Sequence, residues 1–320
     1  MSTSTAPPIT TAAPASAWSK PLTVAAVALL CCLLWGSSYP AIKSGYALFS
    51  IAQADLPGKL LFAGWRFVLA GGFVLIVAAC MGKPVMRTLA QHPRQLLLLG
   101  CAQTTLQYVF FYLGLAYTTG VKGSIMNATA TFFSVLIAHW FYANDRLTPA
   151  KALGCAIGFA GVLAVTLGGN GELGAGFSWL GEGSVVLAAL ILAGASIYGK
   201  QLSQQMDAMA MTGWQLGLGG VVLVLIGFAM GGSLPMPSLQ AMVLLVYLAV
   251  LSSAAFTLWS LLLKHNRVSQ VTIYNFTVPV FGSVLSAFFL GETLWAWHYV
   301  LALVMVCVGI VLVTREGAKK

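Results

Sequence analysis

Long apolar runs follow one another along almost the whole chain, and they limit the possible folds more than any other feature. Hydrophobic residues make up 59% of the 320 positions and charged residues only 7%, whereas a soluble domain carries roughly 25% charged residues. Such a chain cannot cover a water-facing surface. Because a stretch of about 20 apolar residues spans the hydrocarbon core of a bilayer, we predict an all-α integral membrane protein.

Apolar runs separated by Gly, Pro or charged residues predict ten transmembrane helices. Residues 1–19 are rich in Ser, Thr, Ala and Pro and predict a disordered tail. The predicted helices lie approximately at 22–46, 59–80, 95–118, 121–143, 149–168, 181–203, 211–230, 239–262, 268–290 and 296–314.

The positive charges are distributed unevenly between the two sides of the predicted membrane. Most of the sixteen Lys and Arg residues fall on the side of the N-terminus, which by the positive-inside rule is the cytoplasm. We therefore expect both termini to be cytoplasmic and the protein to lie in a cell inner (plasma) membrane. The same rule explains the formal charge of +9 without a nucleic-acid partner.

The two halves of the chain resemble each other. The segment from Asn127 aligns without a gap with the segment from Asn275, and the triplet Gly64-Trp65-Arg66 aligns with Gly213-Trp214-Gln215. Five helices per half is an odd number, so the second half would enter the membrane from the opposite side. We predict two inverted five-helix repeats, at 20–168 and 181–315, with a connecting loop at 169–180 and a cytoplasmic tail at 316–320. Inverted repeats recur in secondary transporters, whose substrates bind near the bilayer midplane.

Three short motifs add a resemblance to a known family. They are LLWGSSYPAIKSG in the first predicted helix, DLPGKLLFAGWRF leading into the second, and FFLGETLW at the end of the ninth. In this order they resemble the drug/metabolite transporter superfamily, in particular its EamA-type ten-helix members, over residues 20–315. The resemblance implies export or exchange of small metabolites, among which amino acids are prominent. The first half departs from the motif at Ala143-Asn144-Asp145, so a role for the acidic turn is not transferred to that half.

Arg66 is the most distinctive candidate for a binding residue. It lies inside the second predicted helix, where a charge is costly unless it is paired, faces a cavity or has a function. Its planar guanidinium is suited to a carboxylate or another anionic group. Two other interpretations remain open, namely snorkelling to the outer interface and a structural pair with backbone carbonyls.

The remaining candidates are polar and aromatic residues within the predicted spans. Pro40 removes a backbone donor and can bend the first helix beside them, and Gln103 and Gln107 share one helix face. Interhelical packing and hydrogen bonding are the alternative explanation for each of them. The predicted substrate-binding set is Trp35, Ser38, Tyr39, Arg66, Gln103, Gln107, Tyr108, Asn127, Thr131, Tyr198, Gln215, Trp259 and Asn275.

These observations predict a secondary transporter that moves a small metabolite, such as an amino acid or a related compound, by alternating access, as an exporter. The alternative is an intramembrane enzyme acting on a lipid-linked substrate, which would need a nucleophile or metal ligands gathered at one depth. The match to G-x-G-x-x-G at Gly169–Gly174 joins two membrane spans rather than a strand and a helix, so it does not indicate nucleotide binding. We expect no cofactor and no metal, and the oligomeric state stays open.

Overall fold

The computed structural model describes residues 17–117, 120–168, 178–290 and 297–317, and every regular element within these ranges is helical. The longer helices are α1 (Pro21–Leu48), α2 (Leu56–Cys80), α6 (Gly120–Phe141), α7 (Pro149–Gly168), α8 (Ser184–Gln205), α9 (Ala208–Ala229), α10 (Leu239–His265), α12 (Thr277–Leu290) and α13 (Trp297–Gly317). The shorter ones are α3 (Val85–Gln91), α4 (Pro93–Gly100), α5 (Gln107–Tyr117) and α11 (Val268–Thr272).

Several of these helices are long and apolar enough to cross a bilayer. Among the described residues six continuous helical stretches qualify by length and hydropathy: Pro21–Leu48, Leu56–Cys80, Pro93–Tyr117, Trp179–Gln205, Ala208–Ala229 and Leu239–His265. The prediction of an all-α membrane protein is confirmed. Ten crossings and the predicted division of the chain into domains stay predictions, and most of the proposed N-terminal tail and connecting loop lie outside the described residues.

Local sequence signals set the starts and ends of the helices. The Asp55 carboxylate accepts from the Gly58 backbone N at 2.8 Å at the start of α2, and Asp207 caps α9 in the same manner, which satisfies backbone donors that a helix start leaves free. At their other ends α2 and α9 are followed by Gly82 (φ 72°) and Gly231 (φ 81°), a backbone conformation that glycine adopts without strain.

The predicted span 268–290 is not one continuous helix. It consists of α11, a 3-10 turn at Ile273–Phe276, and α12. Pro279 accounts for the interruption, because it has no N–H to donate to the Asn275 carbonyl and its ring crowds that carbonyl. A second irregularity is the π-helical turn Cys101–Leu106, which joins α4 to α5 within one span.

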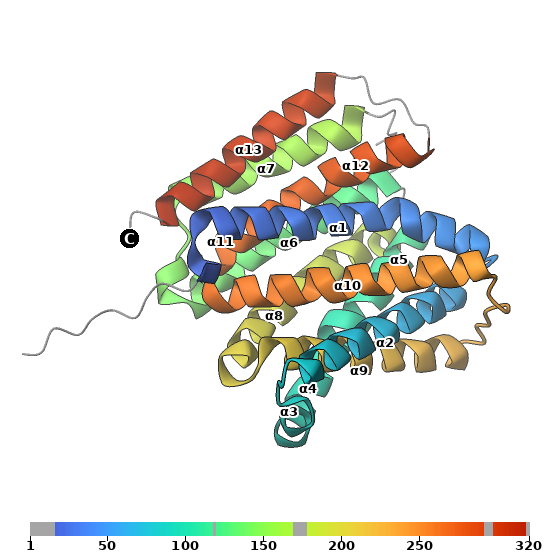
Figure 1. Cartoon of the computed structure of the whole chain (residues 1–320). Helices are drawn as coiled ribbons and strands as arrows, with labels where there is room; N and C mark the ends of the chain where they lie inside the picture. Colours follow the sequence, from blue (N-terminus) through green and yellow to red (C-terminus); the bar gives the residue numbers. More distant parts are fainter. Residues whose placement is uncertain (1–16, 118–119, 169–177, 291–296, 318–320) are drawn as a thin grey trace, which may run out of the picture.

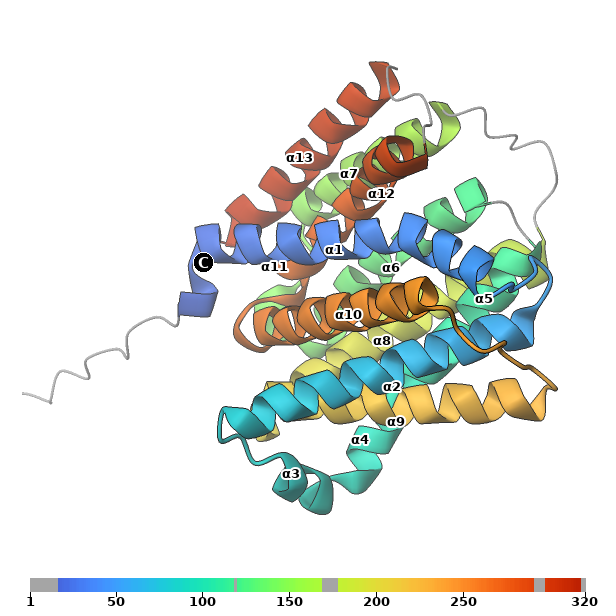
Figure 2. The same cartoon turned by 45° about the vertical axis from the view of Figure 1, so that its right-hand side comes forward.

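Two close helix pairs lie on opposite sides of the bundle. Figures 1 and 2 show α2 beside α9 on one side and α7 beside α13 on the other, and these are the most extensive packing partners. Between them α1 packs on α10 and α12, while α8 packs on α5 and α6. The start of α1 and the end of α13 lie at the same end of the bundle (Figure 1).

Glycines allow the helices of each close pair to approach. A Cβ added at Gly71 of α2 would lie 2.4 Å from the Gly217 backbone nitrogen of α9, and one added at Gly154 of α7 would lie 2.9 Å from the Gly309 carbonyl oxygen of α13. Small residues at such contacts let backbones pack directly against each other in membranes. The candidate site is surrounded by α2 of one pair and by the helices that lie between the two pairs.

Candidate functional site

A cavity of about 320 Å³ lies among the central helices. Its walls come from α1, α2, α5 and the π-helical turn before it, α6, α8, α10 and the segment from α11 into α12, so both halves of the chain contribute. The volume is at the lower end of the range of small-molecule sites, about 300–1,000 Å³.

Most of the predicted binding residues lie together in this cavity. Eleven of the thirteen line it, and Tyr198 and Gln215 do not. The lining residues from the predicted set are Trp35, Ser38, Tyr39, Arg66, Gln103, Gln107, Tyr108, Asn127, Thr131, Trp259 and Asn275.

Arg66 lies on α2 with only 2% of its surface exposed. Its Nε donates to the Ser252 hydroxyl of α10 at 2.8 Å, and that hydroxyl donates in turn to the Leu248 carbonyl at 2.7 Å. The guanidinium carbon lies 5.1 Å from the centre of the Phe67 ring. Among the described residues, Ser252 is the hydrogen-bond partner of Arg66, and it binds Nε. The two terminal nitrogens of the guanidinium therefore remain able to donate to a solute. Burial inside the bundle disfavours snorkelling.

Aromatic side chains form much of the cavity wall. Trp35 stands edge-on to Trp259 and Phe256, with ring centres 5.0 and 5.6 Å apart, and Tyr108 is 4.7 Å from Phe67. Such tilted contacts orient the rings and add to the stabilisation from their burial. The wall therefore offers rigid apolar surface beside the Arg66 charge.

Tyr46 and Tyr112 both line this cavity, and the Tyr46 hydroxyl is buried without a hydrogen bond to the described residues. An unpaired buried hydroxyl is costly, so a solute group that reached it would gain a hydrogen bond.

Neutral polar groups complete the lining. Gln103 and Gln107 come from the π-helical turn and the start of α5 and are nearly buried. On α6, Asn127, Thr131 and Ser134 lie along one face, because residues four and seven apart align on a helix. Irregular π turns within helices often occur at functional sites, and this one contributes the Gln103 amide to the cavity lining.

Gln215 and Tyr198 have other surroundings. The Gln215 amide donates to the Thr104 hydroxyl at 2.8 Å and links α9 to the π-helical turn. Tyr198 packs against an apolar cluster that includes Leu99 and Leu202. Interhelical packing, the alternative explanation from the sequence, accounts for both placements.

Helical spacing could have found two lining residues that were absent from the predicted set. Tyr46 is seven residues after Tyr39 on α1, and Ser134 is seven residues after Asn127 on α6. Both steps bring a residue back to the same helix face.

A second, larger cavity of about 1100 Å³, called here the end cavity, lies where α1 begins and α13 ends. Among its lining residues are the basic side chains Lys200, Lys264, Arg267 and Arg315. Tyr142 also lines it, and burial, together with the nearby Asp145 carboxylate, raises the pKa of Tyr142 above its usual value. Among the described residues that line the end cavity, Asp145 is the one with a carboxylate, and it forms an ion pair with Lys151.

An all-helical bundle of apolar helices with an internal cavity the size of a small solute places the chain among the polytopic membrane proteins. The model of the EamA-like transporter family matches residues 22–167 and 179–315. The chain therefore belongs to the EamA-like transporter family.

Individual relatives agree with this assignment. The chain is 28% identical to the uncharacterized transporter YvbV of Bacillus subtilis over 90% of each sequence. It is 28% identical to the uncharacterized inner membrane transporter YedA of Escherichia coli over 88% of this chain and 87% of that protein. A solved crystal structure superposes with a TM-score of 0.78 at 18% identity, covering 93% of this chain and 98% of the other, which shows a common fold.

Proposed function

We propose that this protein is a secondary transporter that exports a small carboxylate-bearing metabolite, such as an amino acid or a related compound, by alternating access. The observation that carries this proposal is Arg66. Its guanidinium is buried at a cavity whose described lining contains no Asp or Glu. A charge in that position requires a partner, and an anionic solute would supply one through the donor fork of the arginine.

The charge of the second cavity supports an anionic solute. The end cavity carries Lys200, Lys264, Arg267 and Arg315, while the carboxylate of Asp145 is already neutralised by Lys151 at 2.6 Å. A cavity with one sign of charge raises the local concentration of the opposite ion. An anion entering from this end would move from one positive region to the next.

Pairwise packing supports the two inverted repeats and, with them, ten crossings. An inverted repeat would pair equivalent helices around one axis, and the packing of α2 with α9 and of α7 with α13 is the arrangement expected from it. The contact of α1 with α12 then corresponds to that of α8 with α6. The backbone after α2 and after α9 ends the helix with closely similar geometry at Gly82 and Gly231. These two glycines are separated along the chain by the same number of residues as Gly64 and Gly213, which the sequence match pairs.

The location proposed is a bacterial inner membrane with both termini in the cytoplasm. The relative YedA is named an inner membrane transporter, and the described ends of this chain lie at the same end of the bundle (Figure 2). The basic residues of the end cavity are then on the cytoplasmic side, as the positive-inside rule requires. The relatives are named transporters, which favours transport over the alternative of an intramembrane enzyme.

The role of Arg66 is tested by uptake of labelled carboxylate solutes into liposomes that contain the purified protein. Arg66→Gln should weaken transport strongly, since removing one member of a buried charge pair costs about 2–5 kcal/mol, roughly 30- to several-thousand-fold in affinity. Arg66→Lys should recover part of the activity, because it restores the charge without the donor fork. Gln215→Ala is the matched control, since it occupies the equivalent position in the other half and lies outside the cavity lining.

Two results would contradict the proposal. One is saturable transport of a carboxylate solute by Arg66→Gln with unchanged affinity and rate. The other is an equal loss in Gln215→Ala, which would mean that the damage is to packing. Thermal melting in detergent must show that each variant is folded before its transport is compared.

A further inference from the structure

One short segment lines both cavities. It comprises α11 and the following 3-10 turn, Val268–Phe276, and is called here the partition segment. Gln270 and Tyr274 of this segment line the end cavity, whereas Thr272 and Asn275 line the central cavity. Its two sides therefore face different spaces, and it forms part of the boundary between them together with α1, α8 and α10, which also line both cavities.

The Asp145 carboxylate binds the start of the partition segment. The Ser269 backbone N donates to Oδ2 of Asp145 at 2.9 Å, and the Ser269 hydroxyl donates to Oδ1. Asp145 itself is 1% exposed. These two bonds connect a loop of the first half of the chain to a segment of the second half, 124 positions apart.

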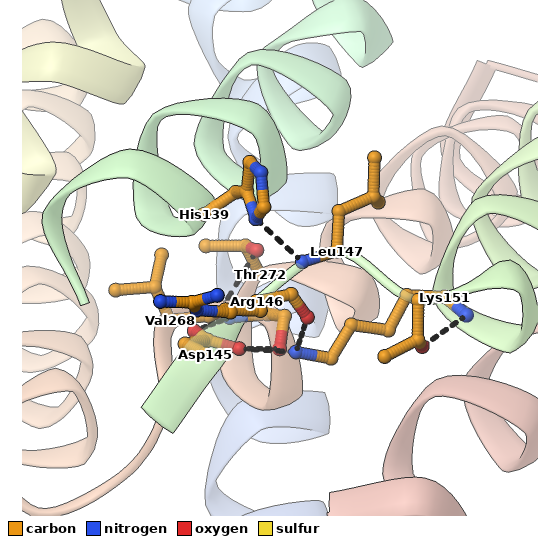
Figure 3. Close-up of polar contacts among 9 residues, drawn as sticks. His139, Asp145, Arg146, Leu147, Lys151, Val268 and Thr272 are labelled. Atoms are coloured by element: carbon orange, nitrogen blue, oxygen red, sulfur yellow. Dashed lines mark hydrogen bonds and ion pairs between the residues drawn. The ribbon is translucent and has the colours of Figure 1, made fainter. Parts of the chain in front are cut away.

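Lys151 compensates the charge of Asp145 from within the first half. Its Nζ donates to Oδ1 of Asp145 at 2.6 Å and to the Arg146 carbonyl at 2.9 Å, and Figure 3 shows these side chains beside α11. The same loop is also fixed by a hydrogen bond from the Leu147 backbone N to Nδ1 of His139 at 3.0 Å (Figure 3). Asp145, in the turn after α6, and its counter-charge Lys151, at the start of α7, therefore both belong to the first half of the chain.

Asp145 binds Lys151 within its own half of the chain and Ser269 in the other half, so the two contacts respond differently to a movement of the partition segment. If the partition segment moves away, Asp145 loses two hydrogen bonds to Ser269 but keeps Lys151, so no buried charge is left without a partner. Separating the ion pair itself would be far more costly. The hydrogen bond from the Thr131 hydroxyl of α6 to the Thr272 carbonyl is long, at 3.4 Å. The other described contacts of the segment with α6 are apolar, such as that of the Phe276 ring with Phe132 at 6.0 Å between ring centres, and they have no fixed hydrogen-bond geometry to break.

We propose that Asp145 controls a gate between the two cavities: when it binds Ser269 the partition segment closes the path, and when it releases Ser269 the segment moves and the cavities join. This inference rests on the proposed function, because alternating access requires the central cavity to open toward each side in turn. Asp145 is thus a positioning residue, which acts through the partition segment and does not contact the solute.

The test measures access to the central cavity and needs no known solute. The six native cysteines (Cys31, Cys32, Cys80, Cys101, Cys155 and Cys307) are replaced, and Ser134→Cys places one thiol in the central cavity, where Ser134 is 4% exposed. Sealed vesicles of each orientation are treated with the membrane-impermeant anion sulfonatoethyl methanethiosulfonate, and the rate of thiol modification is measured.

The gate is weakened in two ways, by Ser269→Ala, which removes one donor, and by Asp145→Asn, which removes the charge. We expect each to raise the modification rate about ten-fold or more, only from the side on which the end cavity opens, with the larger effect in Asp145→Asn. Ser253→Ala is the matched control, because that hydroxyl also bridges the halves, to the Ala70 carbonyl at 2.9 Å, but lies away from the partition segment. Its rate should not change.

Unchanged rates in folded Ser269→Ala and Asp145→Asn would overturn the gate, as would equal increases from both sides or an equal increase in Ser253→Ala, which would indicate general loosening. The experiment is independent of the Arg66 test, since thiol modification requires no transported solute. A protein that fails to transport carboxylates can still show the gate, and a protein without the gate can still transport them.

Discussion

The contact between α2 and α9 makes a sharp prediction about a single methyl group. In Gly71→Ala the new Cβ would lie 2.4 Å from the Gly217 backbone nitrogen, whereas ordinary contacts begin at 3.4 Å, so the two helix backbones would have to separate by about 1 Å. Backbone atoms cannot rotate away as a side chain can. Overpacking of this kind costs about 1–3 kcal/mol.

The neighbouring Gly72→Ala is an unusually close control. A Cβ there meets no atom within 4 Å, and both variants gain the same helix propensity, about 1 kcal/mol. Thermal unfolding in detergent should therefore place Gly71→Ala below Gly72→Ala by about 1–3 kcal/mol, which is several degrees at roughly 2–4 °C per kcal/mol. Equal melting temperatures would refute the close approach of α2 and α9.

Three further outcomes are expected. Reporters fused to the two ends of the chain should both signal the cytoplasm, and signals from opposite sides would contradict an even number of crossings. Lys151→Met should destabilise the protein by about 3–5 kcal/mol because it leaves the Asp145 carboxylate buried without its partner, and adding Asp145→Asn should restore most of the melting temperature; no recovery would mean that the pair is not coupled. Lipophilic quaternary cations should be poor substrates, since Arg66 and Lys43 line the central cavity with no described carboxylate, and robust efflux of such a cation would disprove this.

The class of fold and the main polar residues of the cavity lining could be predicted from the sequence because both depend on local patterns. Hydropathy determines which segments enter the bilayer, and polar residues on apolar helices have few alternatives to an internal cavity. Arg66, Gln103 and Asn127, which this reasoning selects, line the same cavity. Whether they bind substrate is a separate question that the transport experiment answers.

The exceptions depend on which helices become neighbours, and local patterns do not contain that information. Gln215 reaches the Thr104 hydroxyl, 111 positions away, because α9 packs against the π-helical turn. The ungapped alignment of the two halves pairs Asp145 with Thr293, so it indicates no role for this carboxylate. A shift of one position pairs it with Glu292 instead, and the buried bonds from Ser269 show that this carboxylate has a structural partner.

The hydrogen bond between Arg66 and Ser252 joins helices from different halves of the chain, α2 and α10. If the halves move relative to each other, the direction of the guanidinium changes with them, so the affinity for an anion differs between the two conformations. A solute shifts a conformational equilibrium only by the difference in its affinity for the two states. If Arg66 binds the solute as proposed, its bond to Ser252 also supplies the thermodynamic linkage by which binding drives the change of shape.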